Sequence, residues 1–281
     1  QIIYCSISGF GLSGPYAKRA GFDLVAQGMS GLMSINGHPG APPSKMGVPV
    51  ADLNAGMFAA SGILAAYISR LRTGRGQYLE TSLLEAALAY TVWESSIYFA
   101  TGEVPGPLGS THRLVAPYQA LRTSDGYINI GAANQANWER MCRAMGRDDL
   151  LEDDRFADNA ARMVALAELQ PEIERTLAGQ STEHWLSVLE DAGVPAGPIY
   201  DLAEAWSDPQ VKAREMDVTL ELPGAGVLHN IGLAVKMYGT PGEIRLPPPR
   251  LGEHTDEILE FAGYSAGEID AMRAQGVFGA R

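Results

Sequence analysis

Short apolar runs and longer helical patterns alternate through the first hundred residues. Residues 1–8 alternate apolar and polar side chains and are rich in β-formers, which predicts a strand, and residues 77–82 predict a second one. Between them, apolar positions recur at helical spacing over 22–34, and a small-residue helix is predicted over 55–71. A further helix is predicted over 83–101. Because strands and helices alternate, this part is expected to be α/β with a parallel sheet.

The pattern changes after residues 102–109, a stretch rich in glycine and proline that predicts a linker. Two β-rich runs, 118–122 and 127–130, flank Asp125-Gly126, and this spacing predicts a β-hairpin. Helical patterns and two more strand-like runs follow without regular alternation, which predicts a smaller α+β domain. The helical patterns cover 135–145, 158–177, 182–192 and 255–261, and the strand-like runs cover 216–222 and 227–236.

Composition and charge exclude several classes of function. Hydrophobic residues make up 46% of the 281 residues, enough to bury a core. The net charge is -12, whereas nucleic-acid-binding proteins are usually basic, so no nucleic-acid partner is expected. The longest apolar run, residues 56–68, is shorter than the roughly 20 residues that span a bilayer, so no membrane partner is expected. Two cysteines and no visible secretory signal predict a cytoplasmic protein.

Residues 9–14 spell G-F-G-L-S-G directly after the first predicted strand, a match to the G-x-G-x-x-G dinucleotide fingerprint. That fingerprint needs a helix that begins at the motif and an acidic residue about 20 positions later. Here Pro15 and Gly21 interrupt the following segment, and the first acid, Asp23, comes too early. We therefore expect a glycine-rich turn and no NAD. Histidine and cysteine spacings match no metal motif, so no metal is expected either.

Asp52 stands between a short apolar run at 48–51 and the helix predicted from residue 55. An acid at this place is either the helix N-cap or a site group at the carboxyl end of a strand. The helix dipole and the first backbone N–H groups favour the ionised carboxylate, and an ionised carboxylate is a competent nucleophile. The two interpretations are compatible.

Six motifs follow one another along the chain. They are G-F-G-L-S-G-P-Y-A-K-R-A-G-F-D-L-V-A-Q at 9–27, G-V-P-V-A-D-L-N-A-G at 47–56, T-G-R-G-Q-Y-L-E-T-S-L-L-E-A at 73–86, V-A-P-Y-Q-A-L at 115–121, G-V-P-A-G-P-I at 193–199 and P-P-P-R-L-G-E-H-T at 247–255. In this order they resemble the class III CoA-transferases, the CaiB/BaiF family that also includes the 2-methylacyl-CoA racemases. The similarity runs from residue 1 to the C-terminus, and within the family the pattern is most similar to the succinyl-CoA:dicarboxylate transferases.

The resemblance implies a Rossmann-like large domain that holds coenzyme A, a smaller α+β domain and an interlocked homodimer. It places part of the large domain at 1–105, a linker and active-site loop at 106–116, the small domain at 117–230 and a return to the large domain at 231–281. Proteins of this family carry a further N-terminal stretch before the position of Gln1, so we expect the natural chain to be longer.

The resemblance also implies the chemistry. Asp52 is the expected nucleophile, attacking an acyl-CoA donor such as succinyl-CoA to form a covalent aspartyl intermediate that a carboxylic acid then resolves. The expected cofactor-binding residues are Arg19, Gln27, Arg72 and Arg75, although Arg72 and Arg75 also fit as helix-end charges. Gly109, Ser110 and His112 occupy the region of the family's glycine-rich loop, but without its run of consecutive glycines, so they are interpreted as substrate or loop residues.

Two alternatives remain open. A racemase of this family uses a histidine in a G-H-D motif thirty residues before the catalytic aspartate, and this chain has Phe22 in G-F-D there. Because phenylalanine exchanges no proton, the sequence favours a transferase. A catalytically inactive family member is the other alternative, against which the intact A-D-L-N-A-G motif argues. The sequence does not identify the donor or the acceptor acid.

Overall fold

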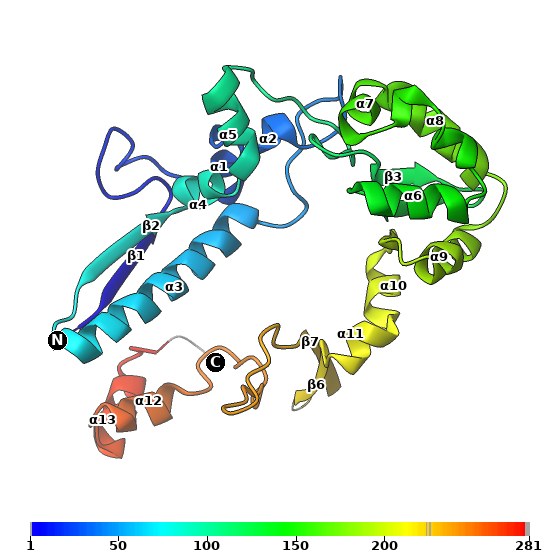
Figure 1. Cartoon of the computed structure of the whole chain (residues 1–281). Helices are drawn as coiled ribbons and strands as arrows, with labels where there is room; N and C mark the ends of the chain where they lie inside the picture. Colours follow the sequence, from blue (N-terminus) through cyan, green and yellow to red (C-terminus); the bar gives the residue numbers. More distant parts are fainter. Residues whose placement is uncertain (1, 223, 225, 279–281) are drawn as a thin grey trace. The chain divides into compact units, whose positions relative to one another are not determined.

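The computed structural model describes residues 2–222, 224 and 226–278 (Figure 1). Its contacts divide the chain into two compact units, Gln1–Ile199 and Tyr200–Arg281. The first unit holds both the α/β segment and residues 117–199 of the predicted small domain, and the predicted domain boundaries stay a prediction. Residues 200–230 group instead with the C-terminal segment.

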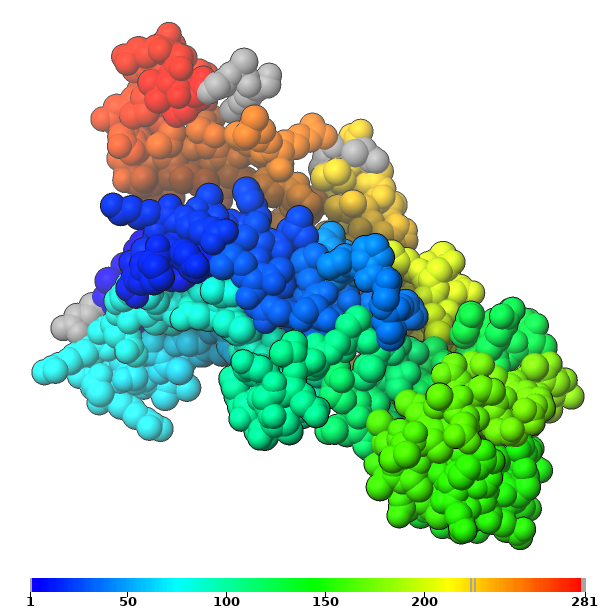
Figure 2. Space-filling model, turned by 90° about the horizontal axis from the view of Figure 1, so that it is seen from above, coloured from blue at the N-terminus to red at the C-terminus, as the bar shows by residue number. Residues whose placement is uncertain are grey.

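The first unit begins with a parallel strand pair, as the alternation predicts. Strand β1 (Tyr4–Ser8) pairs with β2 (Tyr78–Ser82), with Tyr4 opposite Tyr78 and Ser8 opposite Ser82. The long helix α3 (Val50–Thr73) packs against both strands (Figure 1). Helices α1 (Asp23–Met29) and α2 (Leu32–Ile35) precede it. The residues before α3, in blue, lie against the cyan surface of α3 and α4 (Figure 2).

Helix α3 begins five residues earlier than the sequence pattern predicts. Its N-cap is Pro49, which has no side-chain acceptor, so Asp52 lies in the first turn and is not the N-cap. Gly74 ends the helix in the left-handed conformation that glycine tolerates. By length and composition alone, α3 is long and apolar enough to cross a membrane, a property that core helices of soluble proteins share. Its contacts in this unit are with β1, β2, α1 and α4.

The helix predicted over 83–101 is two helices, α4 (Leu83–Ala89) and α5 (Val92–Thr101). The Ser82 side chain caps α4 by accepting a hydrogen bond from Glu85 N–H. The break lies at Tyr90 and Thr91. The Thr91 hydroxyl donates to Leu88 O, and Val92, the first residue of α5, has a positive φ of 33°. A β-branched residue rarely adopts that conformation, so the hydrophobic pattern alone does not reveal the break.

The rest of the first unit is an antiparallel sheet covered by helices. Strands β3 (Tyr118–Arg122) and β4 (Tyr127–Gly131) form the predicted hairpin, and β5 (Ala196–Pro198) adds to β4. The helices are α6 (Gln135–Ala144), the 3₁₀ turns η1 (Asp148–Leu150) and η2 (Asp154–Phe156), α7 (Asn159–Val164), α8 (Leu166–Leu177) and α9 (Thr182–Asp191). The region predicted as one helix over 158–177 is thus α7 and α8, divided at Ala165.

This sheet and its helices enclose the larger of two buried apolar clusters. Its fully buried members include Leu121, Ile128, Trp138, Phe156 and Leu169. A buried arginine also lies in this part: Arg162 donates to the carbonyl oxygens of Ala116 and Phe156 and stacks over the Trp138 ring. Burial lowers the pKa of its guanidinium, and these acceptors compensate the charge.

The described residues of the second unit form short helices and an antiparallel strand pair. Helices α10 (Leu202–Ser207) and α11 (Pro209–Ala213) precede the antiparallel strands β6 (Asp217–Leu222) and β7 (Gly226–Ile231). Helices α12 (Thr255–Phe261) and α13 (Ala266–Ala274) follow, and the first of them has the predicted bounds. The site residues predicted from the sequence all lie in the first unit.

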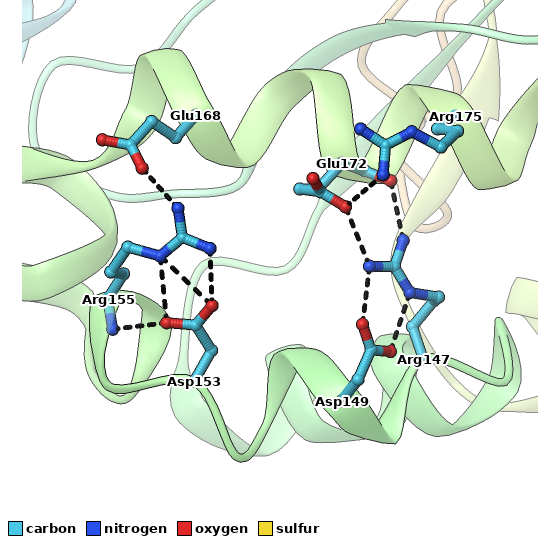
Figure 3. Close-up of polar contacts among 7 residues, drawn as sticks. All are labelled: Arg147, Asp149, Asp153, Arg155, Glu168, Glu172 and Arg175. Carbon is cyan, nitrogen blue, oxygen red and sulfur yellow. Dashed lines mark hydrogen bonds and ion pairs between the residues drawn. The ribbon is translucent and has the colours of Figure 1, made fainter.

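Ion pairs tie α8 to the two 3₁₀ turns (Figure 3). Arg147 donates to Asp149 Oδ1 at 2.8 Å and to Glu172 Oε2 at 3.0 Å, and Arg175 donates to the same Glu172 oxygen at 2.9 Å. Arg155 binds Asp153 and Glu168 in the same way. Hydrogen bonds from Arg147 lower the pKa of Asp149 and of Glu172, and those from Arg155 lower the pKa of Asp153.

These carboxylates predict acid-sensitive stability. Because their folded pKa values lie below the unfolded ones, their contribution is complete above the unfolded value of about 4 and is lost as pH falls through the folded values. The free energy of unfolding, measured by urea titration between pH 7 and pH 3, should therefore fall on acidification. Arg147→Met should reduce this acid dependence, whereas Arg143→Met, which removes one exposed pair with Glu139, should leave it nearly unchanged. Equal profiles for both variants would contradict the assignment.

The apolar core predicts a second difference in stability. Leu169 is fully buried on α8, so Leu169→Ala should lower the free energy of unfolding by roughly 2–5 kcal/mol through lost burial and a cavity. Val164, at the end of α7, is 91% exposed, and Val164→Ala should cost less than about 0.5 kcal/mol. Urea unfolding of both variants measures the difference, and similar costs would refute the packing described for α8.

Candidate functional site

Asp52 is an exposed carboxylate in the first turn of α3. The unpaired N–H groups at a helix start and the positive end of the dipole favour a negative charge there. Ala51, the residue before it, is fully buried and packs in a small cluster with Ala26 and Ala87. The backbone that carries Asp52 is therefore confined on one side while its side chain reaches solvent.

A chain of three hydrogen bonds reaches this turn from residues outside the helix. Ala51 N–H donates to Asp23 Oδ1 at 2.9 Å, and Gln27 Nε2 donates to Asp23 Oδ2 at 2.6 Å. Met46 N–H donates to Gln27 Oε1 at 2.9 Å. Asp23 therefore caps α3 in place of Pro49. Sequence reasoning missed this role, although a proline at the cap position indicates that another residue must supply the acceptor.

Gln27 was predicted to bind coenzyme A, and the structure shows it in a structural role. Its side chain is fully buried, and both ends of its amide are bonded to protein groups. Direct contact with coenzyme A stays a prediction, and it would require these hydrogen bonds to break.

The arginines predicted to bind coenzyme A do not gather at Asp52. Arg72 is exposed in the last turn of α3, with Arg75 just beyond it. Twenty residues of helix separate Asp52 from Arg72, which is about 30 Å at ~1.5 Å per residue. Arg19 is also exposed, and its guanidinium stacks over Phe10 at 5.3 Å and Tyr16 at 5.1 Å. Its position belongs to the glycine-rich turn, not to the start of α3.

The glycine-rich turn after β1 has the structure expected of a turn and not of a dinucleotide site. No helix begins at residues 9–14, and α1 starts only at Asp23. Gly11 and Gly14 have φ values of 89° and 81°, which only glycine adopts readily. The turn is held by the hydrogen bond from Leu84 N–H to Gly9 O.

The predicted loop residues lie on a segment that is bonded along its length. Gly109 N–H donates to Gly37 O at 2.8 Å, Ser110 Oγ accepts from Ala120 N–H at 3.0 Å, and His112 N–H donates to Tyr118 O at 3.0 Å. This segment, 106–112, is therefore fastened to β3 and to the turn at residue 37.

The His112 ring is held between aromatic neighbours. Its centroid lies 5.6 Å from that of Trp93 and 5.3 Å from that of Tyr118. Its Nδ1 accepts a hydrogen bond from Leu114 N–H at 3.0 Å, which leaves Nε2 as the remaining position for a proton in the neutral ring. The ring is thus fixed in orientation.

A polar cavity of about 790 Å³ opens beside this segment. It is bounded by the turn at residue 37, the loop, β3, β4 and α8. It brings Gly109 and Ser110 together with His38 and Arg122, which sequence reasoning did not select, whereas Asp52 and His112 do not line it. The lining residues are Asn36, Gly37, His38, Leu108, Gly109, Ser110, Thr111, Gln119, Ala120, Arg122, Tyr127, Gln170 and Glu174.

Other reactive groups in the described part of the chain form no competing centre. Cys142 is buried in the core beneath the antiparallel sheet, and burial raises the pKa of its thiol to about 12, so the thiol stays protonated. Among the described residues, no group of three or more histidine, cysteine, aspartate or glutamate side chains is arranged to hold a metal ion.

Comparisons with known proteins agree on one family. The family model described as CoA-transferase family III matches residues 1–255. The chain is 38% identical over 259 residues to a succinate–glutarate CoA-transferase of Agrobacterium fabrum, covering 92% of this chain and 65% of that protein. It is 35% identical over 278 residues to the succinyl-CoA:glutarate CoA-transferase of Mus musculus, covering 99% and 64%. The chain thus spans a little less than two thirds of these relatives.

Solved structures give the same result for the fold. A CaiB/BaiF family protein from Brucella suis has a TM-score of 0.79 and 36% identity, covering 93% of this chain and 68% of that one. The protein Rv3272 from M. tuberculosis has a TM-score of 0.81 and 26% identity, covering 91% and 68%. The predicted fold class and the predicted family resemblance are both confirmed.

The bonded loop predicts a contrast between two of its glycines. Gly109 has a φ of 64°, and a Cβ there would lie 2.8 Å from His38 Nδ1, whereas a Cβ on Gly106 meets nothing within 4 Å. Gly109→Ala should lower the free energy of unfolding by about 1–2 kcal/mol through backbone strain. Gly106→Ala is the matched control and should cost less than about 0.5 kcal/mol. Urea unfolding tests both variants, and equal costs would contradict the described loop conformation.

Proposed function

Because the chain belongs to CoA-transferase family III, we propose that its protein transfers coenzyme A from an acyl-CoA donor to a carboxylic acid, with Asp52 as the nucleophile. The observation that carries the proposal is the exposed Asp52 carboxylate at the start of α3, within V-P-V-A-D-L-N-A-G. A carboxylate is a competent nucleophile toward a thioester carbonyl in covalent catalysis.

Asp52 passes through two covalent states in this mechanism. Its carboxylate oxygen attacks the donor carbonyl, the C–S bond breaks, and a mixed anhydride and the CoA thiolate result. The thiolate attacks the Asp52 carbonyl, which releases the donor acid and leaves an aspartyl thioester. The acceptor carboxylate attacks that thioester to give a second anhydride and thiolate. The thiolate then attacks the acceptor carbonyl, releasing the new thioester and the free Asp52 carboxylate.

The proposed substrates are succinyl-CoA as donor and a small dicarboxylic acid as acceptor. The names of the relatives support this choice, since they are succinyl-CoA transferases for glutarate and mesaconate. The polar cavity beside Ser110 supports it as well, because the Arg122 guanidinium there is a suitable partner for a carboxylate. Water exclusion matters because anhydrides hydrolyse, so the fixed segment 106–112 is proposed to shield the site.

We also propose that the protein is an interlocked homodimer and cytoplasmic. Several apolar side chains of α3 are exposed, including Leu53, Met57, Leu64 and Leu71, and a second polypeptide segment would cover them. Both cysteines are free, as in a reducing compartment. No observation favours a racemase: Phe22 precedes α1 with 78% of its surface exposed and carries no proton to exchange.

The nucleophile is tested by isotope transfer. The natural protein containing this chain is incubated with succinyl-CoA and glutarate labelled with ¹⁸O in its carboxylates, and thioesters and peptides are analysed by mass spectrometry. In a single turnover, with enzyme in excess over succinyl-CoA, the mechanism moves one acceptor oxygen onto Asp52, so the peptide containing residues 50–56 should gain one ¹⁸O. Asp52→Ala should lower turnover at least roughly 10³-fold.

Asp158→Asn, which alters an exposed aspartate that caps α7, is the control and should retain activity. The reaction is repeated in heavy water with a 2-methylacyl-CoA. Deuterium at the α-carbon without new thioesters would refute the transferase and favour a racemase. New thioesters without label on residues 50–56 would refute Asp52 as the nucleophile.

A further inference from the structure

Three hydrogen bonds next to the first turn of α3 link Met46 to Ala51 through the side chains of Gln27 and Asp23. They form a directed chain, in which each donor and each acceptor is fixed. Met46 N–H and Ala51 N–H are both obligate donors, and the side chains of Gln27 and Asp23 connect them. We infer that Asp23 is a positioning residue for the transfer reaction, acting with Gln27 to set the direction of the Asp52 carboxylate. The inference rests on the proposed function.

Only one assignment of donors and acceptors satisfies this chain. Met46 N–H needs an acceptor, so the oxygen of the Gln27 amide must face it and the Nε2 must face Asp23. Asp23 then accepts from Gln27 Nε2 on one oxygen and from Ala51 N–H on the other. An ionised carboxylate accepts at both oxygens, whereas an amide of the same shape accepts at only one. The position therefore requires an acid, and an asparagine does not satisfy it.

Burial makes this chain of bonds a rigid support. Gln27 and Ala51 are both fully buried, and Asp23 is half-buried. Hydrogen bonds in such surroundings are stronger than in water, and leaving one of their members unpaired costs more. Residues 47–50, which lead into α3, are thus bonded at both flanks, at Met46 and at Ala51.

The hydrogen bonds of Asp23 and Gln27 set the orientation of the Asp52 carboxylate through the backbone. It follows Ala51 directly, and its own side chain is exposed, so the orientation of the first turn determines where the carboxylate points. Misplacement of a nucleophile by a fraction of an ångström slows an attack that depends on alignment with the thioester carbonyl. Loss of the Asp23 bonds should therefore reduce kcat more than it changes KM.

A pair of substitutions that exchanges the acid and the amide tests the inference. In Asp23→Asn an amide N–H₂ faces Gln27 Nε2, donor against donor, and in Gln27→Glu two carboxylates face each other. The double variant, Asp23→Asn with Gln27→Glu, restores every bond. The carboxylate now at position 27 accepts from Met46 N–H and from the amide nitrogen now at position 23, and the amide oxygen at position 23 accepts from Ala51 N–H. The net charge of the pair is also unchanged.

The expected results are kinetic. In the natural protein containing this chain, with succinyl-CoA and glutarate, each single variant should lower kcat at least roughly tenfold with KM within about twofold, and the double variant should recover to within about threefold of wild type. Asp158→Ala removes a helix cap elsewhere and is the control: it should lower the melting temperature without changing kcat. Amide hydrogen exchange of residues 46–55, measured without substrate, should rise in the single variants and return in the double variant.

Different failures identify different errors. If wild type transfers CoA, Asp52→Ala does not, and Asp23→Asn keeps its kcat, the positioning role is refuted and the proposed function stands. If the single variants lose activity but the double variant does not recover, the directed chain of bonds is not the cause, and the inference falls. If wild type transfers no CoA, the proposed function itself fails, whereas normal hydrogen exchange in the single variants refutes the structural support independently of activity.

Discussion

The start of α3 depends on a hydrogen-bond acceptor that another helix supplies. Pro49 stands at the N-cap and has no side-chain acceptor, so Ala51 N–H is satisfied by Asp23, the first residue of α1. A buried backbone donor without a partner would destabilise the structure, and Asp23 removes that cost. The same contact joins α1 to α3 next to the buried alanines Ala26 and Ala51. The candidate nucleophile, Asp52, is therefore exposed on a turn whose backbone is held by Asp23.

A second constraint acts on the segment at 106–112. Its backbone and side chains form hydrogen bonds to the turn at Gly37 and to β3. The segment therefore connects the α/β part of the first unit to the antiparallel sheet. A polar cavity lies beside it, where Gly109, in a left-handed conformation, passes close to His38. The two features make different contributions: the start of α3 presents the proposed nucleophile, and the loop forms one wall of a polar cavity that Arg122 and His38 also line.

Much of the fold follows from local pattern. Period-two alternation correctly predicts β1, and the Asp125-Gly126 turn correctly predicts the β3–β4 hairpin, because side-chain alternation and turn chemistry are local properties. Breaks within helical patterns were missed at Thr91 and Ala165, where side-chain bonding and backbone conformation override the hydrophobic spacing. The beginning of α3 was missed for a related reason, since its cap lies 28 residues away in the sequence.

The sequence by itself determined the α/β class, the family and Asp52 as the candidate nucleophile, because periodicity and motif order do not depend on distant contacts. Only the tertiary structure decided that Gln27 is a buried bonding partner and that Asp23 caps α3. It also decided that Arg122 and His38 share a cavity with Ser110. These relations join residues far apart in the chain, and hydrogen-bond direction and burial, which exist only after folding, determine them.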